Sequence, residues 1–334
     1  MSAEHVDSRW GPADARGAVR CRLGSFQMHY SVPAGLYALG RPGQDSPVMV
    51  TASYKLTFDI LRKDLAGIDC WILVLDTGGI SVWCAATGGS FGTEELITRV
   101  TRTRLAEVVR HRELTLPQLG AAGMHASRVL KQTGFHLRYG PARSCDLVQY
   151  LKDGRVTPPM RKITFGLLDR LVLVPMEMGK SLKLFLGFAF AAIIYAGLAP
   201  NGVALQKAWT GVWPLLALGL GSVLAGSVLA PVLLPWIPFR AFTAKGWLLG
   251  AVASGALLHG AALAWGMNPF LLAACWLFFP AAAGYLALRF AGATTFITPG
   301  AARRETRLAV PFFAAAAVLT AAALVLSRLK PGGF

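Results

Sequence analysis

A cysteine within a glycine-rich stretch is the most chemically capable group in this sequence. The stretch runs from Asp76 to Thr93 and reads Asp-Thr-Gly-Gly-Ile-Ser-Val-Trp-Cys-Ala-Ala-Thr-Gly-Gly-Ser-Phe-Gly-Thr, with Cys84 next to Trp83 near its middle. A thiol here can bind a soft metal as its thiolate, or it can pack as a small buried hydrophobe. Because glycine carries no Cβ, it lets the backbone approach a bulky ligand closely. The stretch therefore predicts a ligand site with one thiol, and a structural thiol is the alternative.

Few other residues suggest catalysis. The sequence has no Walker loop and no G-x-S-x-G motif, and none of its five cysteines forms the C-x-x-C pair typical of zinc or iron–sulfur sites. His111, His125 and His136 lie among basic residues, so we expect them at the surface. Asp76 ends a predicted strand, where it can contact a ligand or cap the next turn. Trp83 can pack on a planar ligand or in the core.

Predicted strands and helices alternate through the first half of the chain. Apolar runs predict strands at 48–51, 71–75, 114–116 and 135–139, and helical spacing predicts helices at 54–65, 93–110, 124–132 and 145–152. This order predicts a doubly wound α/β sheet, in which ligands bind beyond the carboxyl ends of the strands. Those ends are small, polar or glycine-bearing here: Thr51–Ser53, Asp76–Thr77, Pro117–Gly120 and Tyr139–Pro141.

Three further segments have weaker patterns. We expect residues 1–30 to be a loosely ordered lead-in, residues 33–47 to be rich in turns and residues 171–174 to be strand-like. The first 24 residues lack the apolar core of a signal peptide, which predicts a cytoplasmic location for the soluble part.

The composition indicates a membrane protein. Of 334 residues, 54% are hydrophobic and 15% are charged, and the mean hydropathy is +0.50. We expect a lead-in at 1–30, a soluble domain at 31–180 and a membrane domain at 181–334. The net charge of +16 does not indicate nucleic acid, because the basic residues are dispersed or flank apolar spans and no nucleic-acid motif is present.

Five apolar spans are expected in the membrane domain. They lie at about 182–199, 211–230, 246–265, 269–290 and 308–327, each near the ~20 residues that cross a bilayer. Basic residues gather on one side of these spans: Lys180, Lys183, Arg240, Lys245, Arg303, Arg304 and Arg307. The positive-inside rule therefore predicts a multi-pass protein of the cytoplasmic membrane, with the soluble domain inside and the C-terminus outside.

The glycine-rich stretch resembles a known motif. Residues 71–93 are similar to the cap-helix region of the membrane corrinoid protein of mercury methylation, whose signature is N-V-W-C-A-A-G-K followed by a G-T-F-G-T-like run. Ser81, Thr87 and Gly88 depart from that signature. The related corrinoid iron–sulfur protein of the acetyl-CoA pathway has a similar domain without a membrane tail, so the tail favours the mercury family. The remaining similar segments are Gly35–Gly40, Ser46–Val48, Thr51–Leu56, His111–Arg112, Leu116–Gly120 and Tyr139–Pro141.

The resemblance implies a specific function. It implies a Rossmann-like domain that binds a cobalamin-type corrinoid in its base-off form, followed by an all-α transmembrane domain of five helices. Cys84 would be the lower axial ligand of cobalt, and the protein would be a methyltransferase that passes a methyl group to Hg(II). The alternatives are a membrane-anchored corrinoid-binding methyl carrier or sensor with a different acceptor, and a domain without corrinoid in which Cys84 is structural.

The resemblance also implies partners and a set of cofactor contacts. The chain would hold no iron–sulfur cluster, so a ferredoxin-like protein with two four-iron clusters would reduce the cobalt, and a methyltetrahydrofolate-linked donor would supply the methyl group. The implied corrinoid contacts are Thr51, Ser53, Tyr54, Asp76, Thr77, Ser81, Val82, Trp83, Cys84, Ala85, Ala86, Phe91, Gly92, Thr93, Gln118, Leu119, Gly120, Tyr139, Gly140 and Pro141.

Overall fold

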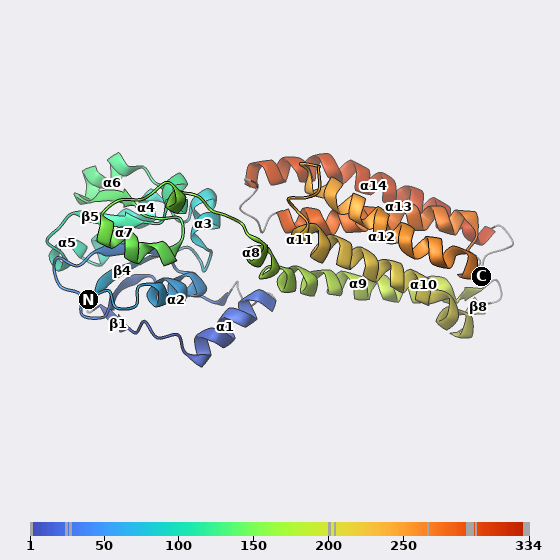
Figure 1. Cartoon of the computed structure of the whole chain (residues 1–334), viewed down its shortest axis with the longest axis horizontal. Helices are drawn as coiled ribbons and strands as arrows, with labels where there is room; N and C mark the ends of the chain where they lie inside the picture. Colours follow the sequence, from blue (N-terminus) through green and yellow to red (C-terminus); the bar gives the residue numbers. More distant parts are fainter. Residues whose placement is uncertain are drawn as a thin grey trace. The chain divides into compact units, whose positions relative to one another are not determined.

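The chain forms two compact units. The computed structural model describes residues 3–23, 26, 29–199, 202–203, 205–265, 267–291, 297 and 299–329. Unit 1 comprises Met1–Thr164 and unit 2 comprises Phe165–Phe334. Unit 1 is an α/β domain and unit 2 is helical (Figure 1), which confirms the expected α/β class and the expected helical C-terminal part.

Unit 1 is built on a mixed sheet. Its described strands lie in the order β1–β2–β4–β3–β5–β6, and β3, β4, β5 and β6 run parallel to one another. Strand β2 is antiparallel to β4, and β1 is parallel to β2. The bounds are Glu4–Val6 (β1), Gly35–Leu39 (β2), Val48–Ala52 (β3), Cys70–Leu75 (β4), Glu113–Leu116 (β5) and His136–Tyr139 (β6). The four strands predicted from the apolar runs are the parallel part of this sheet.

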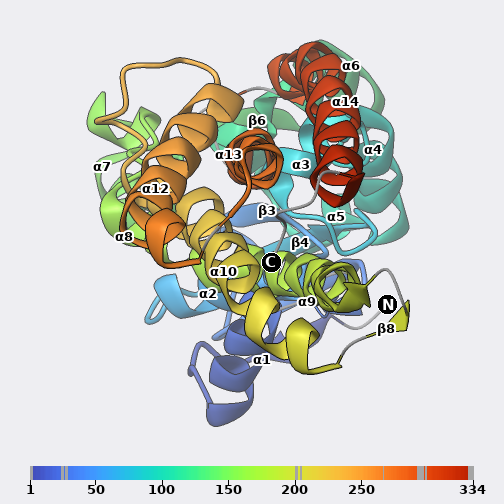
Figure 2. The same cartoon turned by 90° about the vertical axis from the view of Figure 1, so that its right-hand side faces the viewer.

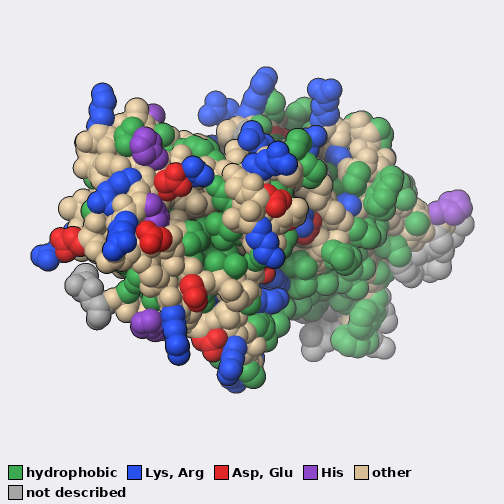
Figure 3. Space-filling model, turned by 60° about the vertical axis from the view of Figure 1, so that its left-hand side comes forward, with side chains coloured by type: hydrophobic (Ala, Val, Ile, Leu, Met, Phe, Trp, Pro, Cys, Tyr) green, Lys and Arg blue, Asp and Glu red, His purple; other side chains and the backbone are tan. Residues whose placement is uncertain are grey.

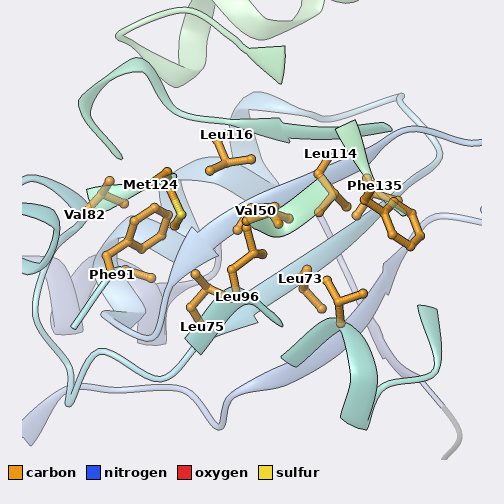
Figure 4. Close-up of a cluster of buried hydrophobic side chains, with 14 of the residues drawn as sticks. Val50, Leu73, Leu75, Val82, Phe91, Leu96, Leu114, Leu116, Met124 and Phe135 are labelled. Atoms are coloured by element: carbon orange, nitrogen blue, oxygen red, sulfur yellow. The ribbon is translucent and has the colours of Figure 1, made fainter. Parts of the chain in front are cut away.

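Helices cover both faces of the sheet. The central strands carry apolar side chains on both sides, and these must be buried away from water. Val50 and Leu73 face a core completed by α3, α4, α5 and α6 (Figure 4). Met49 and Ile72 face the other way, into a core completed by α2 and α7. The helices are α2 (Lys55–Asp64), α3 (Val82–Gly88), α4 (Thr93–Arg102), α5 (Leu105–Val108), α6 (Ala126–Thr133) and α7 (Leu147–Asp153).

The amino-terminal segment is ordered where the structure describes it, so the expectation of a loose lead-in is wrong. Strand β1 and helix α1 (Pro12–Leu23) form there. Arg62 on α2 bonds Asp14 at 2.7 Å and Asp59 at 3.0 Å. It also donates to the carbonyl oxygens of Asp7 and Arg9. These contacts between distant parts of the chain leave no periodic pattern in the sequence.

Three other local predictions are wrong or incomplete. Turns and bends fill much of 40–46 as expected, but residues 35–39 form β2, which pairs with β4 along its whole length. The helix predicted over 93–110 breaks after Arg102, because Arg104 adopts a left-handed conformation with φ 48°. Residues 171–174 form no strand: α8 (Leu167–Leu171) ends there, Val172 and Leu173 form a turn, and α9 (Val174–Gly197) begins.

Unit 2 is a set of long apolar helices. They are α9 (Val174–Gly197), α10 (Leu205–Leu224), α12 (Phe242–Trp265), α13 (Pro269–Ala291) and α14 (Pro299–Leu329), with the π-helical segment Ala225–Leu229 and α11 (Ala230–Val232) after α10. Hydrophobic side chains dominate the surface of unit 2, whereas charged ones are scattered over unit 1 (Figure 3).

Four stretches of unit 2 are long and apolar enough to cross a membrane, within the described part of the chain. They are Leu167–Gly197, Gly211–Val232, Pro269–Ala291 and Gly300–Leu329. The fifth predicted span, 246–265, falls within α12, but the side chains of residues 260–265 lie outside the described residues.

Candidate functional site

The order of the parallel strands creates a switch point in unit 1. The chain passes from β3 to its neighbour β4, and then returns to the other side of β3 to form β5. In open α/β sheets, ligands bind outside the carboxyl ends of the strands at such a point. A cavity of about 160 Å³ lies there. Thr51 of β3, Thr115 of β5, Pro117, Pro141 and Val82 of α3 are among its lining residues.

Two buried hydroxyls join the ends of β3 and β4. The Ser53 Oγ accepts the amide hydrogens of Thr77 and Gly79, each at 3.1 Å. The Thr77 Oγ1 accepts the Ser53 amide at 3.2 Å and donates to the Ile80 carbonyl at 2.7 Å. The two hydroxyl oxygens are 3.1 Å apart, so the Ser53 hydroxyl donates to Thr77. Because these bonds use the full capacity of both groups, Ser53 and Thr77 fix the turn after β4.

That turn needs its glycines. Gly78 and Gly79 have φ angles of 63° and 74°, a region that other residues rarely adopt. The Asp76 carboxylate accepts the Gly78 amide at 3.1 Å, so it caps the turn. The Asp76 amide donates to Glu95 at 2.9 Å, and Arg99 binds the same carboxylate oxygen at 2.7 Å. Side chains of α4 therefore support the turn on one side. Asp76, Gly78 and Ile80 of the turn are exposed to solvent.

Helix α3 presents Cys84 to the outside. Val82, Ala85 and Ala86 are buried in the core of unit 1. Cys84, Thr87 and Gly88 are exposed, and their i, i+3, i+4 spacing places them on one face of the helix. Trp83 is half-buried beside them. The thiol predicted to meet a ligand is therefore accessible.

The loop after α3 packs closely against the 3₁₀ segment that contains Gly120. Phe91 is fully buried, and a Cβ added to Gly120 would lie 2.5 Å from a carbon of the Phe91 ring. Thr93 donates to the Gly123 carbonyl at 3.4 Å and accepts the His125 amide at 2.8 Å. Gly92, in an extended conformation, is the N-cap of α4. The Thr93 hydroxyl, at the first position of the helix, binds the following loop.

Gly123→Ala is expected to destabilise this loop. A Cβ on Gly123 would lie 2.1 Å from the Phe91 carbonyl oxygen. Because the obstacle is backbone, the expected loss in the free energy of unfolding is about 1–3 kcal/mol. Urea unfolding followed by circular dichroism measures it. Gly88→Ala is the matched control, since its Cβ would meet nothing within 4 Å; equal losses in the two variants would contradict this account.

The remaining predicted contacts are spread along the same edge, with one exception. Gln118 and Leu119 are half-buried in the 3₁₀ helix η2 (Gln118–Gly123), which packs on α3. Tyr139 ends β6, where burial raises the pKa of its hydroxyl, and the Gly140 amide donates to the Leu116 carbonyl at 2.8 Å. Tyr54 differs, because its hydroxyl faces Cys21 of α1; burial and then that thiol raise the pKa of Tyr54.

The structure adds cavity-lining hydroxyls that the sequence analysis missed. Thr57 of α2, Thr115 of β5 and Ser144 all line the switch-point cavity. The threonine between Leu114 and Leu116 was a usable signal, since it places a hydroxyl between two buried leucines. Among the described residues, no cluster of three His, Cys, Asp or Glu side chains forms a metal site.

These features define a class of protein: an α/β domain with a cavity at the switch point of its sheet. Residues 27–151 match the family described as CO dehydrogenase/acetyl-CoA synthase delta subunit. The chain is also similar to the gamma subunit of the acetyl-CoA decarbonylase/synthase complex from Methanopyrus kandleri, with 37% identity over 123 residues, 36% of this chain and 26% of the relative. The Archaeoglobus fulgidus gamma subunit is 36% identical over 115 residues, 34% of this chain and 24% of the relative.

The similarity is confined to part of each protein. The chain spans about a quarter of the length of these relatives. The family match ends at residue 151, so it covers the predicted site and leaves unit 2 outside.

The expected kinship with the mercury-methylation family is wrong. The matching family and the relatives are named for acetyl-CoA synthesis or cleavage. Hg(II) as methyl acceptor is therefore withdrawn, together with the ferredoxin-like and methyltetrahydrofolate-linked partners. The Trp-Cys-Ala-Ala motif forms one turn of α3. Its alanines are buried in the core, so the motif reflects the packing of that helix and does not identify a methyl acceptor. The apolar tail, which favoured the mercury family, lies outside the matched segment.

Proposed function

We propose that unit 1 binds a corrinoid at the carboxyl edge of its sheet and carries a methyl group in acetyl-CoA metabolism. The observation that carries this proposal is the place of the switch-point cavity within the segment matched by the acetyl-CoA synthase family. The resemblance to the corrinoid iron–sulfur protein of the acetyl-CoA pathway supports it. This function corresponds to the alternative of a methyl carrier whose acceptor is not mercury.

The edge fits a large flat ligand with a tail. A Cβ on Gly78, Gly88 or Gly89 would meet nothing within 4 Å, so the backbone is open to a planar group. Cys84 stands on the same helical face as Gly88. The cavity of about 160 Å³ offers threonine hydroxyls and apolar walls to a tail that enters between β3 and β5.

The chain's own residues would bind, orient and shield the cofactor. A bound corrinoid supplies a cobalt that accepts and releases a methyl group. Cys84 would hold the cobalt through its sulfur, and a thiolate ligand would donate electron density to the metal. The glycines would let the ring approach α3, while Thr51 and Thr115 would hydrogen-bond the tail. Ser53, Thr77 and Asp76 would keep the turn after β4 in the shape that receives the ring.

The partners proposed for unit 1 are other subunits of a complex. The relatives are named as subunits of acetyl-CoA decarbonylase/synthase complexes. A carrier must meet one site that donates the methyl group and another that accepts it, so we infer that both sites lie on associated subunits.

Cys84→Ala is expected to change the absorption spectrum of the corrinoid-loaded full chain. Loss of a sulfur ligand alters the electronic transitions of cobalt, whereas binding through the tail persists. Cys145→Ala is the matched control, since Cys145 is the other exposed cysteine among the described residues. Failure of the wild-type chain to take up corrinoid would contradict the proposed function. Identical spectra for wild type and Cys84→Ala would contradict only the role of Cys84 as a cobalt ligand.

We also propose that unit 2 anchors the protein in the cytoplasmic membrane. Lys180, Lys183, Arg303, Arg304 and Arg307 lie at the end of unit 2 where α9 begins, which favours a cytoplasmic position for that end. Unit 1 would then be cytoplasmic and the C-terminus outside. Membranes washed at alkaline pH should retain the chain, and its release would contradict this placement.

A further inference from the structure

An open seam separates α9 from α14 in unit 2. Helix α9 packs on α10 and α14 packs on α13. Among the described residues, α9 and α14 meet at one end, where the Tyr195 hydroxyl lies 2.6 Å from the Ser327 Oγ and Arg328 donates to the Tyr195 carbonyl oxygen. In the apolar stretches that contain α9 and α14, only 11% and 17% of the residues are buried, against 56% in the stretch of α13. The end-on view in Figure 2 shows the ribbons of α9 and α14 apart from each other.

Two apolar cavities occupy the seam. Their volumes are about 310 and 350 Å³, and the rings of Phe188, Phe278 and Phe279 line both. Phe188 stacks on Phe278 with ring centroids 5.6 Å apart, so this pair lies between the cavities. On α9 the lining runs from Ser181 through Phe188 to Tyr195. At the rise of an α-helix, this distance is about 21 Å, most of the thickness of a hydrocarbon core.

The volume of the two cavities is too small for a helix of a partner protein and suits a hydrocarbon chain. A helix with side chains is about 10 Å across, so a 21 Å length of it would need about 1,600 Å³. The two cavities together provide less than half of that volume. An extended acyl chain is narrow enough for either cavity, and a chain that reaches both would pack on the Phe188–Phe278 pair between them.

One end of the seam is positively charged. Lys183 follows Ser181 on α9, and Arg303, Arg304 and Arg307 are exposed on α14 at the same end. The acidic residues of this end are engaged, since Glu177 bonds Lys180 at 2.8 Å and Glu305 accepts the Thr243 amide at 2.8 Å. Basic residues at the cytoplasmic end of membrane helices bind anionic lipid head groups.

We propose that the seam between α9 and α14 binds one anionic phospholipid. One acyl chain lies along Ser181, Phe188 and Tyr195, and the phosphate lies at the basic end, near Lys183 and Arg307. This site depends on the membrane placement of unit 2 and not on the corrinoid chemistry of unit 1.

Native mass spectrometry of the full chain tests the site. The protein is exchanged into mild detergent with equal amounts of phosphatidylglycerol and phosphatidylcholine, and the expected result is one retained phosphatidylglycerol per chain. Ala282→Leu with Ala317→Leu fills the seam and is expected to lower the lipid-bound fraction about tenfold, because the acyl chain loses its apolar contacts. Ala315→Leu is the matched control, since Ala315 is exposed on α14 and lines neither cavity.

Charge variants test the head group. Lys183→Gln with Arg307→Gln is expected to abolish the preference for phosphatidylglycerol, whereas Arg102→Gln with Arg110→Gln removes the same charge from unit 1 and leaves the preference intact. Unchanged lipid retention in the seam-filling variant would overturn the proposal, as would a lipid-free dimer, in which a second copy covers the seam. Corrinoid absorbance of the same samples reports on unit 1 separately, and alkaline washing of the membranes reports on the placement of unit 2.

Discussion

Ser53→Ala is expected to destabilise unit 1 and to loosen the turn after β4. The variant leaves the amides of Thr77 and Gly79 without their acceptor, and Ser53 and Thr77 are each only 2% exposed. Leaving a buried donor unpaired costs about 1–3 kcal/mol, so the expected loss is about 3 kcal/mol for this pair of amides. Hydrogen exchange of the full chain should show faster exchange at Thr77 and Gly79.

The control for Ser53→Ala is another serine that accepts an amide. The Ser46 Oγ accepts the Gly43 amide at 3.0 Å, but on an exposed turn where water can replace it. Ser46→Ala should therefore lower stability by less than about 1 kcal/mol. If the two variants were equally stable, the buried hydroxyls would not be what fixes the ligand edge.

Arg62→Met is expected to detach α1 from the rest of unit 1. The Asp59 side chain is 1% exposed, and Arg62 bonds it together with Asp14 and the carbonyl oxygens of Asp7 and Arg9. Lys55 would still lie 2.6 Å from Asp59 and 3.6 Å from Asp14, beside the Tyr30 hydroxyl at 3.5 Å from Asp59 and the Gly11 amide at 2.9 Å from Asp14. Breaking a buried ion pair by removing one partner costs about 3–5 kcal/mol. Limited proteolysis should cut the Arg62→Met variant within α1.

The neighbouring lysine provides the control for Arg62→Met. Lys63 is exposed on the same helix, and its ammonium lies 5.3 Å from the centre of the Trp10 ring. Lys63→Met removes one positive charge and should leave α1 resistant to proteolysis. Equal resistance of Arg62→Met would show that apolar contacts, not the ion pairs, hold α1.

The sequence predicts elements that depend on local patterns. Apolar runs predict β3 and β4, and helical spacing predicts α2 and α4, because burial on a regular element leaves a period in the chain. The break at Arg104 and the strand β2 have no such period. Helix α1 depends on ion pairs to a residue about fifty positions away, and no local rule detects a partner at that distance.

The candidate site is predictable in outline for the same reason. Strand ends can be read from the sequence, so Thr51, Asp76 and Pro141 are found at the expected edge. The roles of individual side chains depend on tertiary contacts. Ser53 and Thr77 use their hydroxyls within the chain, Phe91 packs in the core, and Tyr54 turns toward α1. The identity of a methyl acceptor is not encoded in a single turn of helix, which is why the motif around Cys84 pointed to the wrong family.

Cobalt content after corrinoid loading tests the central claim most directly. The full chain is incubated with cobalamin, freed of unbound cofactor and analysed for cobalt and protein. The wild-type chain is expected to retain about one cobalt per chain. Gly88→Leu should take up little, because its side chain would stand on the open face beside Cys84 without disturbing the fold. Gly43→Leu, an equally open glycine away from the edge, should load like the wild type. Equal loading of Gly88→Leu and wild type would contradict a corrinoid site at this edge.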